Sequence, residues 1–524
     1  MIKRTTVNIN RDPQLSLLDI PINIEPVSKV KPQPISRVFD RPDPEDIFIG
    51  HIRLREYLNT AKVNAPFIIR KLLLTQDWQA LESVYATCGR PPYAPMAMMG
   101  LILYGIQKGI TSLRRLEEFA RTDLGCLWVT GGIAPDHSVI GKFICRHQDQ
   151  ITDQLFKEVT AKVLTQTGGH GRSVAGDGTV IEAACSHYHL LKQEAVEQAL
   201  KATRQAAADN PDDLNRQHQF EQADKTAQEM QSRVEKKQAK SQKTDQLCIS
   251  PTEPDAVIQR QKRGRGSAPS YKPSILVNNH RVILAQAMHG SSENAVIPEM
   301  LDQSEAVTGE KIEELMLDAG YCSHGIIGEA IKRDISLLCP EGRVLGQGKS
   351  SDKKYTKGQF QYDEQEDSYR CPAGEQLVLM STYKGNKKTA GYRQYGSSAC
   401  ANCAQRDKCT TAKAGRKIKR YAQDEWKEAL RMVMGQKQVK ARYSCCRQAW
   451  VEPVFSVLRG NQNLNRFRRK GLDGVRVEFG LHVLAYNIGR LIAFLRACYL
   501  ALLVCIGLFT EQSNELGIIR VRLI

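Results

Sequence analysis

The sequence lacks an apolar run near its N-terminus. It begins MIKRTTVNIN, where basic residues are not followed by the apolar segment that a secretory signal needs, so we expect a protein that stays in the cytoplasm. Long apolar segments are scarce elsewhere too. Residues 497–509 are apolar but too few to cross a bilayer, and Arg496 interrupts their extension, so we expect no membrane span.

Acidic residues are few where basic residues are many. The chain of 524 residues has 74 Lys or Arg against 57 Asp or Glu, a formal net charge of +17 at pH 7. The imbalance is steep between Thr411 and Lys470, where 16 Lys or Arg stand against 4 Asp or Glu. Such a surface attracts a polyanion, either nucleic acid or an anionic membrane, and this density favours the phosphate backbone of nucleic acid.

Histidine partners are missing around the main cysteine cluster. Most of the 15 cysteines are scattered, and in a cytoplasmic protein they favour free thiols or metal binding over disulfides. The cluster has the ligand number and softness that tetrahedral structural Zn²⁺ requires. Reduced buried thiols are the alternative, because no His-rich arm or second Cys-x2-Cys accompanies it. Its members are Cys371, Cys400, Cys403 and Cys409.

Two smaller groups of cysteine and histidine residues are weaker indications of a metal site. The segment CSHYH places Cys185, His187 and His189 at alternate positions, as ligands on a strand would be. Such short coincidences are common, so we favour no metal there. Cys445 and Cys446 are adjacent and lack ligand spacing, so we expect them to be packing residues.

Hydrophobic periodicity predicts an all-α domain, an α/β core and two insertions. After the helical pattern ends near Thr165, strands and helices alternate as they do in a mixed sheet with flanking helices. The Gln-, Ala-, Lys- and Glu-rich arm has too few large apolar residues to bury a face in that sheet. The predicted parts are an N-terminal tail at 1–43, a helical domain at 44–165, the core at 170–345 and 440–497, a helical arm at 190–268, a Cys-rich basic insertion at 346–439 and a C-terminal tail at 498–524.

One segment of the helical domain could face DNA. In DHSVIGKFICRH, with Asp136 or Ser138 as the helix N-cap, Lys142 and Arg146 are one helical turn apart. A DNA-reading helix presents basic residues in this way. A basic face on a packing or dimerisation helix explains the same pattern, so both interpretations stay open.

Three acids stand on separate predicted elements. Asp177 lies between two glycines on the strand SVAGDGTVIEA, where a metal and a phosphate can approach closely. Asp318 follows the strand in LMLDAGY. Glu452 lies on a basic helix that we expect to begin within one turn of it, because Pro453 lacks an amide hydrogen. Such acids can converge on two hard divalent cations, whereas helix caps and surface residues are the alternative.

The sequence resembles a known family at several separated places. It is similar to the DDE transposases of bacterial insertion sequences over most of residues 50 to 495. The matching segments are GRPPYAPMAMMGLILYGIQKGITSLRRLEE, PDHSVIGKF, VAGDGTVIEA, LMLDAGY and VEPVFSVLRGNQNLNRFRRKGLDGVRVEFGLHVLAYNIGRL. The resemblance implies an RNase H-like catalytic core, preceded by a helical transposase domain and interrupted by an insertion before the helix that carries Glu452.

The resemblance also implies a site and its partners. Asp177, Asp318 and Glu452 would bind Mg²⁺ or Mn²⁺ and catalyse cleavage and joining of double-stranded DNA, at the element ends and in the target. We expect a homodimer that is cytoplasmic and nucleoid-associated when bound to DNA, with no membrane partner. The residues expected to contact DNA are Arg447, Arg459, Arg466, Arg468, Arg469, Lys470, Lys142 and Arg146.

Two details depart from the family pattern. The basic residue seven positions after the catalytic Glu is usually Lys in the family, and here it is Arg459. Cys445 and Gln448 stand where a Tyr and an Arg are expected, with Tyr443 and Arg447 slightly earlier. The spacing of a phosphate-orienting contact therefore differs from that of the family.

Two other functions fit the same residues. A metal-dependent nuclease that cuts without joining would use the same three acids. A zinc-containing DNA-binding or architectural protein would have acids with only structural roles. If Glu452 is not the third metal ligand, Glu478 in VRVEFG is the next candidate.

Overall fold

Helices form the N-terminal domain, which the structure describes from residue 38 onward. The computed structural model describes residues 38–505 apart from 87–88, 240–241, 243, 262–265, 291–292, 343–354 and 386–389, so most of both predicted tails lies outside the described residues. Its short N-terminal elements are η1 (Pro44–Asp46), β1 (Phe48–Ile49) and β2 (Ile52–Arg53). The helices are α1 (Leu54–Thr60), α2 (Ala65–Leu74), α3 (Gln79–Glu82), α4 (Pro95–Gln107), α5 (Leu113–Thr122), α6 (Leu124–Thr130), α7 (His137–Arg146), α8 (Gln148–Gln150), η2 (Ile151–Leu155) and α9 (Phe156–Thr167).

Helix α4 is the centre of this domain. Its sequence, PMAMMGLILYGIQ, is apolar on all sides, and nearly all of its residues are buried. A helix that is apolar all round must be enclosed by neighbours, and α4 packs against α2, α5, α6 and the long helix α17 (Gly471–Cys505). Helix α7 begins where the sequence indicated, because the Asp136 carboxylate accepts hydrogen bonds from the amides of Ser138 and Val139.

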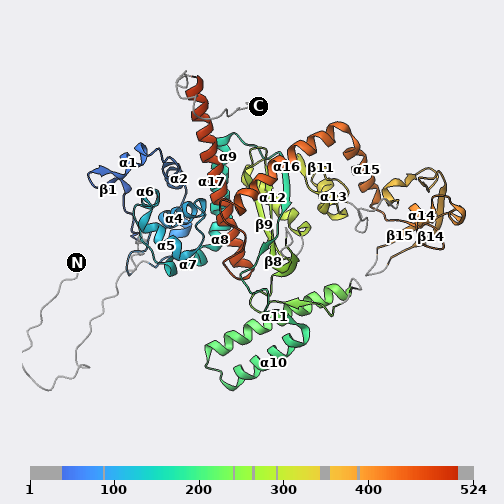
Figure 1. Ribbon diagram of the computed structural model, residues 1–524, viewed down its shortest axis with the longest axis horizontal. Coiled ribbons are helices and arrows are strands. Elements are labelled where there is room, and N and C mark those ends of the chain that lie inside the picture. Colours follow the sequence, from blue (N-terminus) through green and yellow to red (C-terminus); the bar gives the residue numbers. More distant parts are fainter. Residues whose placement is uncertain are drawn as a thin grey trace, which may run out of the picture.

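A seven-stranded sheet forms the core and confirms the predicted α/β class with a mixed sheet. The strands β11 (Ser336–Leu338), β10 (Glu314–Met316) and β3 (Ser173–Gly178) are parallel neighbours, and β3 pairs antiparallel with β8 (Ser267–Val277). Strand β8 also pairs antiparallel with β4 (Ile181–Glu182), β7 (Val257–Arg260) and β9 (Ile283–His289). Further elements of the core are η4 (Asn294–Val296), α12 (Ile297–Thr308), η5 (Ala319–Tyr321) and α13 (His324–Lys332). The sheet stands between the helical domain and the Cys-rich insertion (Figure 1).

The helix that carries Glu452 is longer than predicted. Helix α16 spans Lys437–Arg459, so the expectation that it begins within one turn of Glu452 is wrong. Pro453 inside the helix cannot donate to the carbonyl of Ala449, four residues earlier. That carbonyl accepts a hydrogen bond from Nε of Arg281 at 3.0 Å instead. The helix continues through the proline because a side chain between β8 and β9 supplies the missing donor.

Helix α17 joins the two large domains. Its first half is buried against α4, α9 and β9, whereas most residues after Ile492 are exposed. The segment Gly471–Leu503 is long and apolar enough to cross a membrane by length and composition, and 39% of its most apolar window is buried. The buried half has the environment of a core helix, whereas residues 497–502 of the apolar segment are exposed.

The predicted arm contains two helices that project from the core. Helices α10 (Gln193–Asp209) and α11 (Leu214–Ala239) pack on each other, and β5 (Leu191–Lys192) pairs with β6 (Cys248–Ile249) at their base. Figure 1 shows the helix pair extending away from the sheet. The arm has a small apolar cluster of its own, formed by Val196, Met230, Val234 and Ile249.

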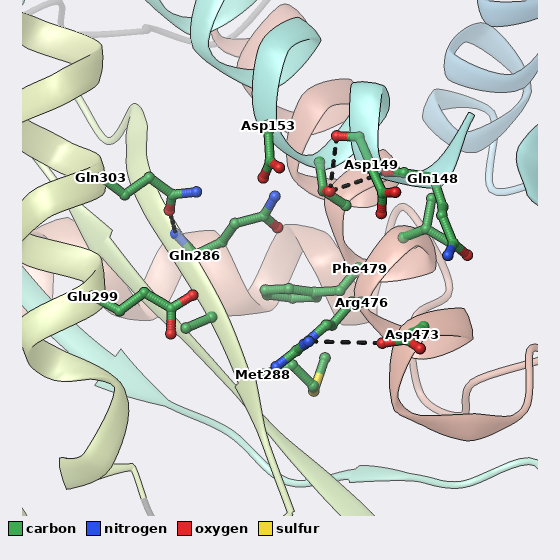
Figure 2. Close-up of a pocket in the computed structure, with 13 residues that line it drawn as sticks. Gln148, Asp149, Asp153, Gln286, Met288, Glu299, Gln303, Asp473, Arg476 and Phe479 are labelled. Carbon is green, nitrogen blue, oxygen red and sulfur yellow. Dashed lines mark hydrogen bonds and ion pairs between the residues drawn. The ribbon is translucent and has the colours of Figure 1, made fainter. Parts of the chain in front are cut away.

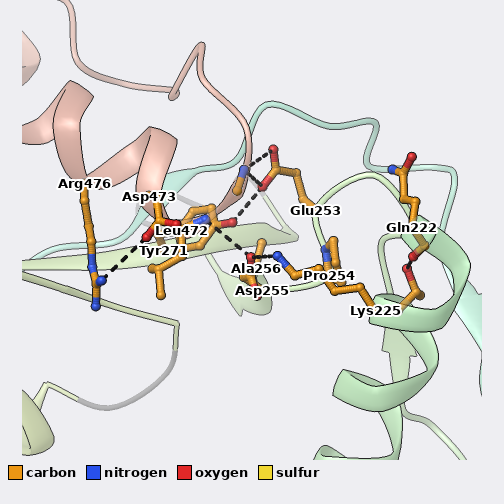
Figure 3. Close-up of polar contacts among 12 residues, drawn as sticks. Gln222, Lys225, Glu253, Pro254, Asp255, Ala256, Tyr271, Leu472, Asp473 and Arg476 are labelled. Carbon is orange, nitrogen blue, oxygen red and sulfur yellow. Dashed lines mark hydrogen bonds and ion pairs between the residues drawn. The ribbon is translucent and has the colours of Figure 1, made fainter. Parts of the chain in front are cut away.

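Polar contacts around Glu253 attach the base of the arm to the core (Figure 3). The buried Glu253 carboxylate accepts hydrogen bonds from the Tyr271 hydroxyl at 2.7 Å and from the Gly471 amide at 3.1 Å. Beside it, Asp255 pairs with Lys225 of α11 at 2.9 Å. The chain then runs directly into β7 and β8 of the main sheet. The arm helices are therefore separable from the core, whereas the segment after them is continuous with the sheet.

Replacing residues 193–246 with a short Gly/Ser linker is expected to leave the core folded and soluble. These residues bury mainly their own small cluster, and the exposed Lys225–Asp255 pair contributes only about 0–1 kcal/mol. As a control, Glu253→Ala in the full chain should lower the free energy of unfolding by about 1–3 kcal/mol, because a buried hydroxyl and a buried amide lose their acceptor. Solubility and thermal unfolding measure both, and aggregation of the linker variant would show that the arm is part of the core.

The Cys-rich insertion is a small domain between β11 and α16. Its antiparallel sheet consists of β12 (Gln361–Asp363), β13 (Ser368–Arg370), β14 (Gln376–Tyr383), β15 (Tyr392–Gly396) and β16 (Ile418–Arg420), in that order. Its helices are η6 (Lys357–Gln359), η7 (Ser398–Asn402), α14 (Arg406–Cys409) and α15 (Asp424–Gly435). Helix α15 packs against α13 and leads into α16, which connects this domain to the core.

Candidate active site

Two of the three predicted acids lie on neighbouring strands. Strands β3 and β10 run parallel with Ala175 opposite Met316. Asp177 and Asp318 each follow two residues later, so the register brings them to the same end of the sheet. Asp177 remains within β3, whereas Asp318 caps the turn η5 by accepting a hydrogen bond from the Gly320 amide at 2.7 Å.

Arg447 of α16 contacts both of these acids. Its guanidinium lies 3.0 Å from the Asp177 carboxylate and 4.0 Å from the Asp318 carboxylate. The Arg447 side chain is only 11% exposed, whereas those of Asp177 and Asp318 are 24% and 44% exposed. A buried guanidinium thus compensates two carboxylates that would otherwise repel each other.

Several neighbouring groups shift the pKa of Asp177. Burial has the largest effect and raises this pKa to about 6. The Arg447 guanidinium and the Gly178 amide, which donates at 2.8 Å, lower this pKa, and the charges of Asp318 and Glu293 raise it again. Acids crowded into a partly buried site are typical of functional sites, because a cation is needed to neutralise them.

Tyr443 fixes the position of α16 against this site. It lies one helical turn before Arg447, and its hydroxyl donates to the Leu317 carbonyl at 3.0 Å, immediately before Asp318. Tyr443 and Arg447 therefore both face the strands that lead to the acids, although they stand earlier in the sequence than the family pattern requires. Their four-residue spacing places them on one face of the helix.

Glu452 lies on the same helix but forms no metal-binding group with the other two acids in the described part of the chain. Its side chain is exposed and makes no hydrogen bond or ion pair with any described residue. Two turns later, Arg459 donates to the Val180 carbonyl at 2.7 Å, two residues after the end of β3. Glu452 is thus carried by a helix that contacts β3 on both sides of it, through Arg447 and Arg459.

Glu293 is an acid beside this site that the sequence analysis missed. A Cβ added to Gly178 would lie 2.8 Å from the Glu293 carboxylate carbon, so only glycine fits next to Asp177 without a shift. Glu293 also pairs with Lys272 at 3.5 Å. Its sequence signal was weak, because an acid between a strand and a helix is more often a surface residue.

Glu478 is placed away from the three acids. It is 8% exposed, and its carboxylate accepts hydrogen bonds from the backbone amides of Arg468 at 3.0 Å and Arg469 at 2.9 Å. These contacts hold the loop between α16 and α17. Its oxygens are therefore already committed to this loop, which disfavours Glu478 as a substitute metal ligand.

Several of the predicted DNA contacts are directed toward the protein itself. Arg466 donates to the carbonyls of Ala183 at 3.1 Å and Cys185 at 2.6 Å. Arg468 donates to the Thr111 hydroxyl at 2.7 Å, and Arg469 to the Cys145 sulfur at 3.4 Å. This loop therefore connects the core to the helical domain.

Lys142, Arg146 and Lys470 of the predicted set are exposed, as are Arg466 and Arg468. Lys470 ends the loop and Lys142 lies on α7, and neither forms a hydrogen bond or ion pair with a described residue. Arg146 stacks over the Tyr85 ring, with its guanidinium carbon 4.9 Å from the ring centre. Lys142 and Arg146 line one cavity of about 590 Å³ in the helical domain. Both interpretations of α7, DNA contact and packing, stay open.

The predicted cysteine ligands come together, whereas the weaker Cys and His group does not. Cys371, Cys400, Cys403 and Cys409 all line one small cavity of the insertion. In the second group Cys185 is buried, while His187 and His189 are exposed. Within the described ranges, no three Cys, His, Asp or Glu side chains are already arranged at metal-binding distances.

A separate acidic pocket lies where η2, β9, α12 and α17 meet (Figure 2). It encloses about 210 Å³, and its lining includes four carboxylates and one guanidinium. These belong to Asp149, Asp153, Glu299, Asp473 and Arg476. Its charge disfavours phosphate, so we place it outside the predicted DNA contacts.

Two family models match the chain. The Transposase DDE domain matches residues 370–492, and the Transposase domain (DUF772) matches residues 60–146. No curated protein and no solved structure matches the chain. The first match includes Arg447 and Glu452, and Asp177 and Asp318 precede it. The second match covers the helical domain from the end of α1 through α7.

Proposed function

We propose that this chain is a DDE transposase of an insertion sequence, which binds the ends of its element and catalyses metal-dependent DNA strand cleavage and strand transfer. The observation that carries the proposal is the pairing of Asp177 and Asp318 with one arginine of the helix that bears Glu452. Elements from distant parts of the sequence thus bring carboxylates and a basic helix to one end of the sheet.

The donor set fits a hard divalent cation. Asp177, Asp318 and Glu452 supply only carboxylate oxygens, which Mg²⁺ and Mn²⁺ prefer, and the two aspartates are neutralised only in part by Arg447. When bound there, two such ions would activate the attacking water or 3′-hydroxyl and stabilise the leaving oxygen. Thiolates suit softer metals, so the four cysteines of the insertion are not part of this site.

The protein side chains have separate tasks in this proposal. Asp177 and Asp318 are held by the sheet and its adjoining turn, whereas Glu452 would turn toward the bound metal from α16. Arg447 orients the two aspartates and keeps α16 against them. Because the strand-bound acids lie on rigid elements, their geometry is suited to in-line attack at a phosphodiester.

DNA binding rests on a distributed set of basic residues. Lys142, Arg146 and Lys470 have exposed side chains that can reach phosphates directly. Arg447, Arg459, Arg466, Arg468 and Arg469 stay in the proposed contact set, although each already contacts the protein. A homodimer would allow one protomer to hold each end of the element.

Incubating purified protein with a duplex that carries an element end, a target plasmid and Mg²⁺ tests the function. We expect end-specific cleavage and a covalently joined product, and DNA binding whose affinity falls steeply with salt. Lys142→Ala with Lys470→Ala should lower the slope of log affinity against log salt by up to about two units without changing cleavage of bound DNA.

The products separate this proposal from its alternatives. Cleavage without any joined product would identify a nuclease. Salt-dependent binding without cleavage in either Mg²⁺ or Mn²⁺ would favour a DNA-binding protein whose acids are structural. Light scattering on the free protein and on the DNA complex measures whether it is a homodimer.

A further inference from the structure

The four cysteines of the insertion converge from separate elements. Cys371 follows β13 and begins a tight turn, in which the Gly374 amide donates to its carbonyl at 2.9 Å. Cys400 lies on η7, Cys403 ends that turn, and Cys409 is the last residue of α14. A β-turn from one side and a short helical segment from the other thus face each other across one cavity.

The cavity has the size of a single ion. Its free volume is about 20 Å³, and all four cysteines line it. A volume of about one water molecule suits a single bound ion. None of the four cysteines is in a disulfide.

The domain around this cavity has little else to stabilise it. Its core consists of five buried side chains, with Cys371 and Cys409 packed against them. Small domains with so few buried side chains commonly depend on a disulfide or a metal for stability. The core residues are Phe360, Tyr369, Leu377, Tyr395 and Ile418.

We propose that Cys371, Cys400, Cys403 and Cys409 bind one structural Zn²⁺ that fixes the turn after β13 to η7 and α14. Zn²⁺ takes four thiolates in a tetrahedron, and binding releases the thiol protons to solvent. The sulfurs are not yet at ligand distances in this structure, so closure needs side-chain rotations around the cavity.

Two neighbouring groups suit a bound zinc–thiolate centre. A centre with four thiolates carries two net negative charges, and Arg416 lines the cavity with a buried Nε that has no hydrogen-bond partner among the described residues. Gly415 approaches so closely that an added Cβ would lie 2.5 Å from the Cys400 Cβ. Arg416 can thus donate toward the sulfurs, as groups around metal ligands commonly do.

Zinc content tests the proposal on the full chain. Protein purified without chelators should contain about one zinc and no iron per chain by elemental analysis. Cys400→Ser with Cys403→Ser should remove this zinc, whereas the control Cys445→Ser with Cys446→Ser, on α16, should keep it. Replacing zinc with Co²⁺ in the wild-type chain should give the intense visible bands of tetrahedral thiolate coordination, a readout that needs no variant to fold.

Three results would contradict the zinc site. Less than stoichiometric zinc, zinc retained by the Cys400 and Cys403 double variant, or cobalt spectra without tetrahedral bands would each overturn the site and favour reduced packing thiols. Zinc content does not depend on strand transfer, so it reports on this site even if the protein proves to have no cleavage activity.

Discussion

Asp177→Asn and Asp318→Asn are each expected to lower Mg²⁺-dependent cleavage by at least on the order of 10³-fold, with little change in DNA binding. Asn keeps the shape of Asp but removes the charged oxygen that a hard cation requires. DNA binding rests on many separate phosphate contacts and should remain, because neither aspartate donates to DNA. The strand register places both acids at one end of the sheet, so each variant removes a ligand of the same proposed metal site.

Cleavage of an end-sequence duplex and binding at several salt concentrations measure the two effects in parallel. Asp318→Asn should unfold near the wild-type temperature, because its carboxylate is 44% exposed, whereas Asp177→Asn should unfold at a somewhat lower temperature, because the buried Arg447 loses its nearest carboxylate. Glu329→Gln on α13 is a suitable control, because it removes a carboxylate that pairs with Arg333 away from the site. Cleavage at the wild-type rate by both aspartate variants would contradict the proposed metal site.

The same assay decides between two acids for the third ligand. We propose Glu452, so Glu452→Gln should abolish cleavage as completely as the aspartate variants do, and its exposed side chain predicts no loss of stability. Glu293→Gln should have a smaller effect, because Glu293 is already paired with Lys272. If Glu293→Gln abolishes cleavage and Glu452→Gln does not, Glu293 holds the metal and α16 supplies only Arg447.

The sequence was most informative where local chemistry decides the structure. The strand predicted before Asp318 is confirmed at Glu314–Met316. The Asp136 cap of α7 is confirmed for the same reason, since a short polar side chain before an apolar helical pattern satisfies its own neighbouring amides.

The sequence was less informative where a distant side chain changes a local rule. Pro453 normally ends or begins a helix, but Arg281 supplies a hydrogen bond to Ala449 from 168 positions away along the chain. Nothing in the local pattern around Pro453 contains that information. The approach of Glu293 to Gly178 is hidden in the same way, because the pairing of strands decides it.

The basic segment before Lys470 shows that sequence charge alone does not identify DNA-contacting residues. A count of charges cannot distinguish an arginine that reaches solvent from one that holds two domains together, because both raise the net charge equally. The guanidinium groups of Arg466, Arg468 and Arg469 donate to protein atoms on the core and the helical domain. Their substitution would therefore affect packing as well as DNA binding, which is why the exposed lysines are the cleaner test.

Arg447 has a role at the acids that predicts a second large effect. In the structure its guanidinium is the cation nearest to Asp177 and also approaches Asp318, which is where a divalent cation would bind. A metal must therefore share or displace this charge. Arg447→Met keeps the apolar stem but removes the charge, so the metal-free protein should lose about 1–2 kcal/mol of unfolding free energy, less than for a fully buried pair because both carboxylates are partly exposed.

Mg²⁺ should then stabilise the Arg447→Met variant more than the wild-type protein. A ligand that binds only the folded state raises the free energy of unfolding in proportion to the logarithm of its affinity, and removing the competing guanidinium should tighten Mg²⁺ binding by about tenfold, or 1.4 kcal/mol. Thermal unfolding across a Mg²⁺ titration measures this stabilisation.

Arg442→Met is a matched control on the same helix, because it breaks an ion pair with Glu314 at 2.7 Å outside the metal site and should leave the Mg²⁺ response unchanged. An equal Mg²⁺ response in Arg447→Met and wild type would mean that the cation binds elsewhere, and adding Asp177→Asn to Arg447→Met should abolish the gain if it binds here.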